Sequence, residues 1–224
     1  MQKRIVIPTV IMSIAVLSIG ISIGIFWNGL YSSDNSDITH SIDTSGLKTG
    51  DFFTYDLKAI FNLEDTNVVA PDYLYQYNTT EYYKVTIMQI EGANITFGIT
   101  WKFSNGTVLA STQTINLATG TKTDQSAFAV VYASHLKLGD LLRPSGNDGL
   151  MVNGTANKQY RDSTRETNYY SANTQTDERS DSWEIYFDKQ TGIMVNLKDI
   201  QSYDNPKMTI TMVWKIVESN VWLV

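Results

Sequence analysis

A stretch of strictly alternating side chains constrains the fold of this chain more than any other feature. Large apolar residues occupy every second position of residues 95–103, and polar or small residues lie between them. A period of two is typical of a β-strand with one buried face. Asn105-Gly106 follows at once, and this pair favours a tight hairpin turn. The sequence therefore predicts antiparallel strands on both sides of that turn.

Similar alternation recurs elsewhere in the chain and predicts a whole sheet. The predicted strands span residues 53–61, 82–89, 95–103, 107–117, 158–170, 183–187, 193–197 and 208–216. The strand over 158–170 is polar, and its mixed charges suit an exposed sheet edge. Eight or nine strands with one apolar face each predict a mainly β domain built as a curved antiparallel sheet, a half-barrel or a sandwich.

Three segments between these strands lack a strand period. Residues 62–78 contain Pro71 and are expected to form a loop. Residues 126–133 are apolar almost throughout, so periodicity cannot separate a helix from a strand, and we expect a short helix or a buried turn. Residues 141–157 carry Pro144 and three glycines and are expected to form a loop.

An uncharged run precedes the β region. Residues 5–27 contain no charged side chain, and a helix of that length, about 35 Å, can cross a hydrocarbon core of roughly 30 Å. Lys3 and Arg4 come before the run, and the next positive residue is Lys48, so the N-terminus is expected in the cytoplasm and the rest outside. A cleaved signal peptide is the alternative, but its apolar core is usually about 7–15 residues, which favours an uncleaved anchor.

These observations give a domain plan. We expect a cytoplasmic segment at 1–4, a transmembrane helix at 5–27, a stalk at 28–46 and a β-rich extracytoplasmic domain at 47–224. The chain is thus predicted to be a single-pass protein of the cell membrane. Gly20 and Gly24 have the G-x-x-x-G spacing that lets two membrane helices pack closely, which predicts a homodimer through the helix. The alternative is that small residues are simply common in membrane helices.

Composition excludes several functions. The net charge is −6, and no cluster of Lys or Arg follows Arg4, so nucleic acid is not an expected partner. The chain has no cysteine, which excludes disulfides, thiolate metal ligands and thiol nucleophiles. His40 and His135 lack the spacing of a zinc site, so we expect no metal and no cofactor.

Two patterns could carry chemistry, but each has a simpler interpretation. Ser134 and Lys137 match the S-x-x-K spacing of certain hydrolases, although S-D-N is missing. Asp177, Glu178 and Asp181 form an acidic cluster that could hold calcium, but Arg179 lies among them and solvated loop charge is the simpler explanation. We therefore predict no catalytic residue.

Four N-x-[ST] sequons occur at predicted turns or strand ends. They begin at Asn78, Asn94, Asn105 and Asn153. Given the predicted exterior location, these are the expected N-glycosylation sites, which would make the chain a glycoprotein.

Two further motifs carry resemblances. L-K-x-G-D occurs at 47–51 and again at 136–140, and F-D-K-Q-T-G-I occurs at 187–193. These marks resemble uncharacterised archaeal-type single-pass surface proteins with an N-terminal anchor and a β-rich ectodomain, a resemblance that implies no activity. The hairpin at 187–193 is also similar to one in LolA/LppX-like half-barrels, which carry lipids or lipoproteins. Neither resemblance assigns a role to any residue.

The sequence thus predicts a non-catalytic, membrane-anchored binding domain. The expected partner on the outside is an envelope component, a surface protein or a lipid-like ligand. The alternative is a structural or accessory subunit of a membrane complex, and a hydrolase comes third. A lipid carrier should enclose an apolar cavity of several hundred Å³. A structural subunit should instead have a filled core and an exposed apolar patch or an unpaired sheet edge.

Overall fold

The computed structural model describes residues 42–64, 70–123 and 129–224. Within them it has nine strands and one helix. Their bounds are β1 Phe52–Leu63, α1 Asp72–Asn78, β2 Thr80–Glu91, β3 Asn94–Phe103, β4 Val108–Asn116, β5 Gly154–Gln159, β6 Thr164–Gln175, β7 Arg179–Asp188, β8 Met194–Asp204 and β9 Lys207–Ser219. None of the helices among the described residues is long and apolar enough to cross a membrane. The predicted membrane helix at 5–27, with Gly20 and Gly24, lies outside the described residues, as does most of the stalk.

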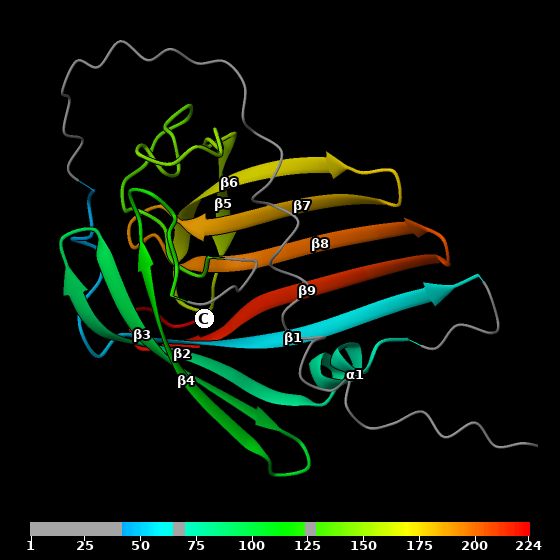
Figure 1. Cartoon of the computed structure of the whole chain (residues 1–224). Coiled ribbons are helices and arrows are strands. Elements are labelled where there is room, and N and C mark those ends of the chain that lie inside the picture. The colour runs from blue at the N-terminus through cyan, green and yellow to red at the C-terminus, as the bar shows by residue number, and fades with distance from the viewer. Residues whose placement is uncertain (1–41, 65–69, 124–128) are drawn as a thin grey trace, which may run out of the picture.

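All nine strands belong to one open antiparallel sheet. Its order is β4-β3-β2-β1-β9-β8-β7-β6-β5. The sheet therefore consists of two meanders, β1–β4 and β5–β9, which join where β1 pairs with β9. Figure 1 shows β6–β9 and β1 side by side, with β2–β4 turning away from them, so the sheet is curved. The predicted mainly β antiparallel fold is confirmed, as a single sheet rather than a sandwich.

The strands bury one side of the sheet, which we call the inner face. In β1, Tyr55, Leu57 and Ala59 are buried, whereas Lys58 and Ile60, on either side of Ala59, are exposed. The β1–β9 register places Leu57 opposite Trp214, so the buried side chains of the two strands share one side. The alternation seen in the sequence is thus the alternation of inner and outer faces.

An extended segment covers part of the inner face. Residues 129–133 are all buried. The Tyr132 amide donates to the Gly192 carbonyl at 2.8 Å, and the Met194 amide donates to the Val130 carbonyl at 3.0 Å. The Tyr132 ring stacks on Phe187 with centroids 4.5 Å apart. A short helix is therefore wrong for 129–133, because the backbone of this segment pairs with the chain that enters β8.

The loop predicted at 62–78 contains a helix, α1, at its end. Pro71 sits at the N-cap of α1, and Leu74 is fully buried against the inner face near Met212. The Asn78 side chain fixes the helix to β1, since Nδ2 donates to the Ala59 carbonyl at 2.8 Å and Oδ1 accepts from the Ala59 amide at 2.9 Å. A seven-residue helix is too short to show a helical period, so the sequence pattern missed it.

The predicted single strand at 158–170 is a hairpin. Residues 154–159 form β5, residues 164–175 form β6, and β5 lies at the border of the sheet. At the opposite border, Leu109 of β4 lies in the predicted strand 107–117 and is 51% exposed.

The repeated L-K-x-G-D motif makes the same turn twice. In each copy the lysine amide donates to the aspartate carboxylate at 2.7 Å. The glycine has a positive φ in both, 93° at Gly50 and 84° at Gly139, a conformation that favours glycine. The Asn116-to-Gly120 and Asp188-to-Gly192 turns also match, because the Gly amide donates to the Asn or Asp carbonyl in each. The repetition in sequence is therefore a repetition of turn chemistry.

Candidate functional site

Apolar side chains of the chain itself pack against one another on the inner face, among the residues that the structure describes. Both meanders, the 129–133 segment and the C-terminal residues contribute. The fully or nearly fully buried side chains include Phe53, Tyr55, Leu57, Ile87, Ile95, Phe97, Ile115, Tyr132, Ile185, Phe187, Ile193 and Leu197. In the described part of the chain, the apolar side chains expected on the concave side of the sheet thus form a packed core.

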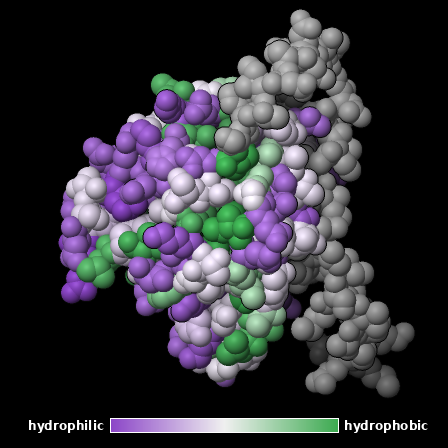
Figure 2. Space-filling model, turned by 90° about the vertical axis from the view of Figure 1, so that its left-hand side faces the viewer, coloured by the Kyte–Doolittle hydropathy of each residue, from purple (hydrophilic) through white to green (hydrophobic). Residues whose placement is uncertain are grey.

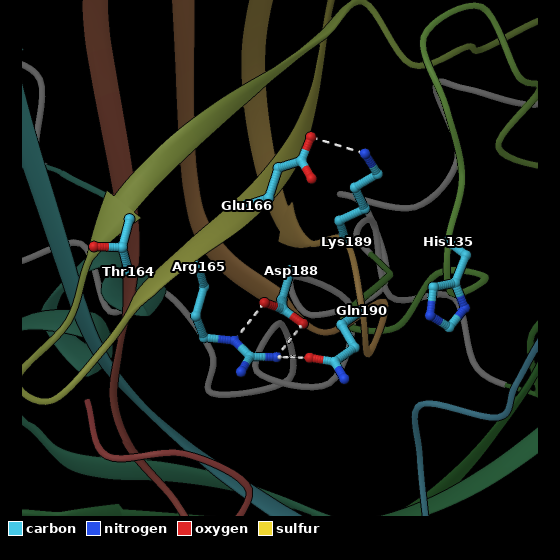
Figure 3. Close-up of a pocket in the computed structure, with 7 residues that line it drawn as sticks. All are labelled: His135, Thr164, Arg165, Glu166, Asp188, Lys189 and Gln190. Carbon is cyan, nitrogen blue, oxygen red and sulfur yellow. Dashed lines mark hydrogen bonds and ion pairs between the residues drawn. The ribbon is translucent and has the colours of Figure 1, made fainter.

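A polar pocket of about 370 Å³ lies at one end of the sheet (Figure 3). It is formed by the start of β6, the β7–β8 turn and the segment before the second L-K-x-G-D turn. The lining residues are His135, Thr164, Arg165, Glu166, Asp188, Lys189 and Gln190. Its size lies within the range of small-molecule sites, and five of its seven lining residues have ionisable side chains.

One ion pair dominates this pocket. The Arg165 guanidinium donates to both carboxylate oxygens of Asp188, at 2.6 and 2.9 Å, and also to Gln190 Oε1 at 3.1 Å. The same guanidinium lies 4.4 Å from the ring centre of Trp222. Asp188 is 1% exposed and also accepts from the Thr191 amide and hydroxyl, so it holds the β7–β8 turn in place. Arg165 thereby ties β6, this turn and the C-terminal segment together.

The remaining charged groups of the pocket are also paired. Lys189 Nζ donates to Glu166 Oε1 at 2.8 Å. His135 stands apart from the other side chains in Figure 3, and its Nδ1 lies 2.9 Å from Asp43 Oδ2. Two cationic and two anionic side chains balance each other in the lining, so the pocket has little net field to attract a charged ligand. We interpret this arrangement as a structural clamp.

The S-x-x-K pair does not form a catalytic arrangement. Ser134 is buried and its Oγ has no hydrogen-bond partner in the structure, whereas Lys137 is exposed. The segment that holds both residues forms turns rather than a helix. A lysine that deprotonates a serine must lie within hydrogen-bond reach of it, and here it does not.

The acidic cluster of the β6–β7 turn does not gather around a metal site. Asp181 pairs with Arg179 at 2.6 Å. Among the described residues, no three His, Asp or Glu side chains come together in a way that could hold a metal ion.

A buried acid on the inner face escaped the sequence analysis. Asp199 of β8 is 2% exposed, and its Oδ2 accepts a hydrogen bond from Gln201 Nε2 at 2.8 Å. The pKa of Asp199 is raised to about 6, mainly by burial and also by the nearby Asp181 carboxylate, while the hydrogen bond from Gln201 and the charge of Arg179 oppose the shift. The sequence contained a signal for this position, because the alternation of the predicted strand 193–197 continues past its expected end. Asp199, two residues after Leu197, falls on the same face.

The four sequons lie where turns and strand ends were predicted. Asn78 ends α1, Asn94 begins β3, Asn105 lies in the β3–β4 turn, and Asn153 directly precedes β5. Both polar atoms of the Asn78 side chain bond to Ala59, whereas Asn105 and Asn153 use Oδ1 alone among the bonds found in the structure. N-glycosylation, which modifies Nδ2, stays a prediction, and Asn78 is the position where a glycan would break an existing contact.

The outer edge of β4 presents free backbone groups. Thr114 of β4 directs its amide and carbonyl away from β3, because the amide donates to Thr123 Oγ1 and the carbonyl accepts from the Thr123 amide. Backbone direction alternates along a strand, so Val108, Ala110 and Thr112 also point their amides and carbonyls outward. The structure gives none of these six groups a hydrogen-bond partner in the described part of the chain. We call residues 108–112 the free edge.

Side chains leave the free edge unprotected. All five of its residues are exposed, and Val108 and Leu109 are each 51% exposed. It has no charge and no proline, the two devices that usually prevent edge strands from pairing with other chains. The opposite border differs, since β5 is six residues long and carries Lys158.

Most of the surface that Figure 2 displays is hydrophilic, and its apolar residues appear as separate patches.

Comparisons with known proteins add no assignment to these sites. Scanned against models of protein families, the chain matches none, and a search of curated proteins finds no significant match. The two resemblances based on its motifs therefore stay predictions.

Proposed function

We propose that this chain is a non-catalytic, membrane-anchored extracytoplasmic domain that binds a protein partner through the free edge of β4. The observation that carries the proposal is the uncharged, exposed and unpaired backbone at 108–112. An extended segment of a partner can add to such an edge as a further strand, with main-chain hydrogen bonds supplying affinity.

The inner face supports a protein partner over a lipid-like ligand. Its apolar side chains pack against one another and against residues 129–133, so a hydrocarbon chain would have to displace buried residues such as Phe187 and Leu197. Displacing well-packed core side chains costs several kcal/mol, about 2–5 for each large residue lost from a core.

The polar pocket supports the same conclusion. Each charged side chain in its lining already has an ionic partner. A ligand there would have to compete with the two-bond contact between Arg165 and Asp188, a geometry among the strongest that side chains form. The membrane anchor at 5–27 enters the proposal from the sequence, as the element that holds the domain at the outer surface.

Site-specific photo-crosslinking of the full chain in its native membrane tests this function. A photoreactive amino acid replaces Thr112 on the free edge, or Ile60, which is 65% exposed on the outer face of β1, as the control. We expect a protein adduct from position 112 and none from position 60. Absence of an adduct at 112, or equal labelling at both positions, would contradict the proposal.

A further inference from the structure

We infer that the strand that completes the free edge is the free edge of a second copy of this chain. The inference rests on the proposed function and specifies its partner. Two β4 strands would pair antiparallel about a two-fold axis. The outward amides and carbonyls of each strand would then bond to the outward carbonyls and amides of the other.

The length of the free edge fixes the register of this pairing. On one side it ends at the β3–β4 turn, where Gly106 has a φ of 86°. On the other side Thr123 already bonds to Thr114. Five residues remain, and Ala110 is the middle one. With Ala110 on the two-fold axis, Val108 of each copy lies opposite Thr112 of the other, and all twelve outward groups of the two copies find a partner.

Side chains favour a second copy as the occupant. The chain is acidic overall, with a net charge of −6, so a surface at which two copies meet must itself be free of like charges. Residues 108–112 carry no charge, and therefore self-pairing in this register places no like charges opposite each other. It also brings the exposed side chains of Val108 and Leu109 against the partner copy.

The two borders of the sheet explain why the assembly would stop at two. Growth into a fibre needs a second open edge, and β5 at the other border carries Lys158, a charge of the kind that prevents edge strands from pairing. Pairing through β4 alone is self-complementary and closes with two copies.

Single cysteines in the full chain test the register, since the natural sequence has none. Ala110→Cys places two thiols opposite each other across the axis, where directly paired strands have Cα atoms roughly 4.5–5.5 Å apart, within disulfide range. Val108→Cys is the register control, because four residues of offset separate two copies of position 108 by roughly 14 Å. Ala156→Cys is the matched control on β5, an alanine on the outer face at the other border.

We expect a disulfide-linked dimer from Ala110→Cys under mild oxidation in membranes, and a yield at least about tenfold lower from Val108→Cys and Ala156→Cys. Equal yields from the three variants, or none from Ala110→Cys, would overturn the inference. The two experiments distinguish failure of this inference from failure of the proposed function. A protein adduct at position 112 whose mass is not twice that of the chain, with no disulfide at position 110, would reject the second copy and keep the protein-binding function. No adduct at 112 would reject both.

Discussion

The buried carboxylates and the free edge of β4 differ in whether their polar groups have hydrogen-bond partners within the chain. Two buried carboxylates have partners: Asp188, at one end of the sheet, pairs with Arg165, and Asp199, on the inner face, accepts a hydrogen bond from Gln201. On the free edge, the outward amides and carbonyls of 108–112 meet none in the described structure. An unpaired polar group is costly when buried and inexpensive in water. These two carboxylates are therefore satisfied within the chain, whereas the free edge gains partners when another strand binds.

This difference separates two kinds of substitution. Changes on the inner face should alter the free energy of unfolding, and changes on the free edge should alter association while leaving stability nearly unchanged. The following four predictions test that separation.

The largest effect is expected at Asp188. Replacing Asp188 with Ala leaves the guanidinium of Arg165, whose side chain is 16% exposed, without its counter-charge and removes the bonds to Thr191. Loss of one partner of a buried ion pair typically costs about 3–5 kcal/mol, and we expect that loss in urea unfolding. Asp188→Asn should lose less stability than Asp188→Ala, because an asparagine side chain can keep the turn. Asn116 does so in the equivalent Asn116-to-Gly120 turn. Equal losses for the two variants would show that the ion pair, which both variants lose, provides the stability and that the turn contributes little.

Substitution of Asp199 is expected to raise the free energy of unfolding, whereas substitution of Asp188 lowers it. Its pKa is raised from 3.8 to about 6 in the folded state, so folding favours the protonated acid. The resulting stabilisation is complete below about pH 4 and is lost as the pH rises through 6. Asp199→Asn should therefore remove this pH dependence and raise the free energy of unfolding at pH 8 by up to about 3 kcal/mol. The control is Asp204→Asn at the exposed end of the same strand. A variant that is less stable than the natural chain at pH 8 would contradict the account.

An intermediate effect is expected at Asn78. Replacing Asn78 with Ala removes two hydrogen bonds to the backbone of Ala59 and frees α1 from β1, which should cost about 1–3 kcal/mol. Thermal unfolding monitored by circular dichroism measures the loss. Asn62→Ala, at an exposed position of β1, is the matched control and should be nearly neutral. If both variants unfold at the natural temperature, α1 is not held by this contact.

The smallest effect on stability is expected on the free edge. Ala110→Lys and Ala156→Lys each add one charge at a border of the sheet, at an exposed and a half-buried position respectively, and should change the free energy of unfolding by less than about 0.5 kcal/mol. Their effects on association should differ, because Ala110→Lys places two like charges across the axis of the paired strands. Sedimentation of the full chain in detergent should then show loss of the dimer for Ala110→Lys alone. Loss of the dimer in both variants, or in neither, would remove the contrast between β4 and β5.

Local patterns predicted most of the sheet. Alternation and turn residues placed β3 with its Asn105-Gly106 turn, and they placed the core of β7, β8 and β9. These elements depend on interactions between near neighbours in the chain, which a sequence displays directly.

Features that depend on distant contacts were missed. The pairing of β1 with β9 joins residues about 160 apart, as between Tyr55 and Ile216, and no local pattern shows it. The 129–133 segment is extended because it bonds to the chain around Gly192. The Arg165–Asp188 ion pair joins two ordinary surface residue types that the fold brings together. The free edge was also missed, because a strand shows which residues alternate and not which border of a sheet it occupies.

Residue-resolved hydrogen exchange in β4 tests the central claim most directly. In full-length protein dissociated by dilution in detergent, the amides of Val108, Ala110 and Thr112 should exchange rapidly. The amides of Leu109 and Ser111, which point toward β3, should exchange slowly. In membranes, where the edge is bound, all five should exchange slowly. Slow exchange of all five in the dissociated chain would contradict the account, since the edge would already be paired within one copy.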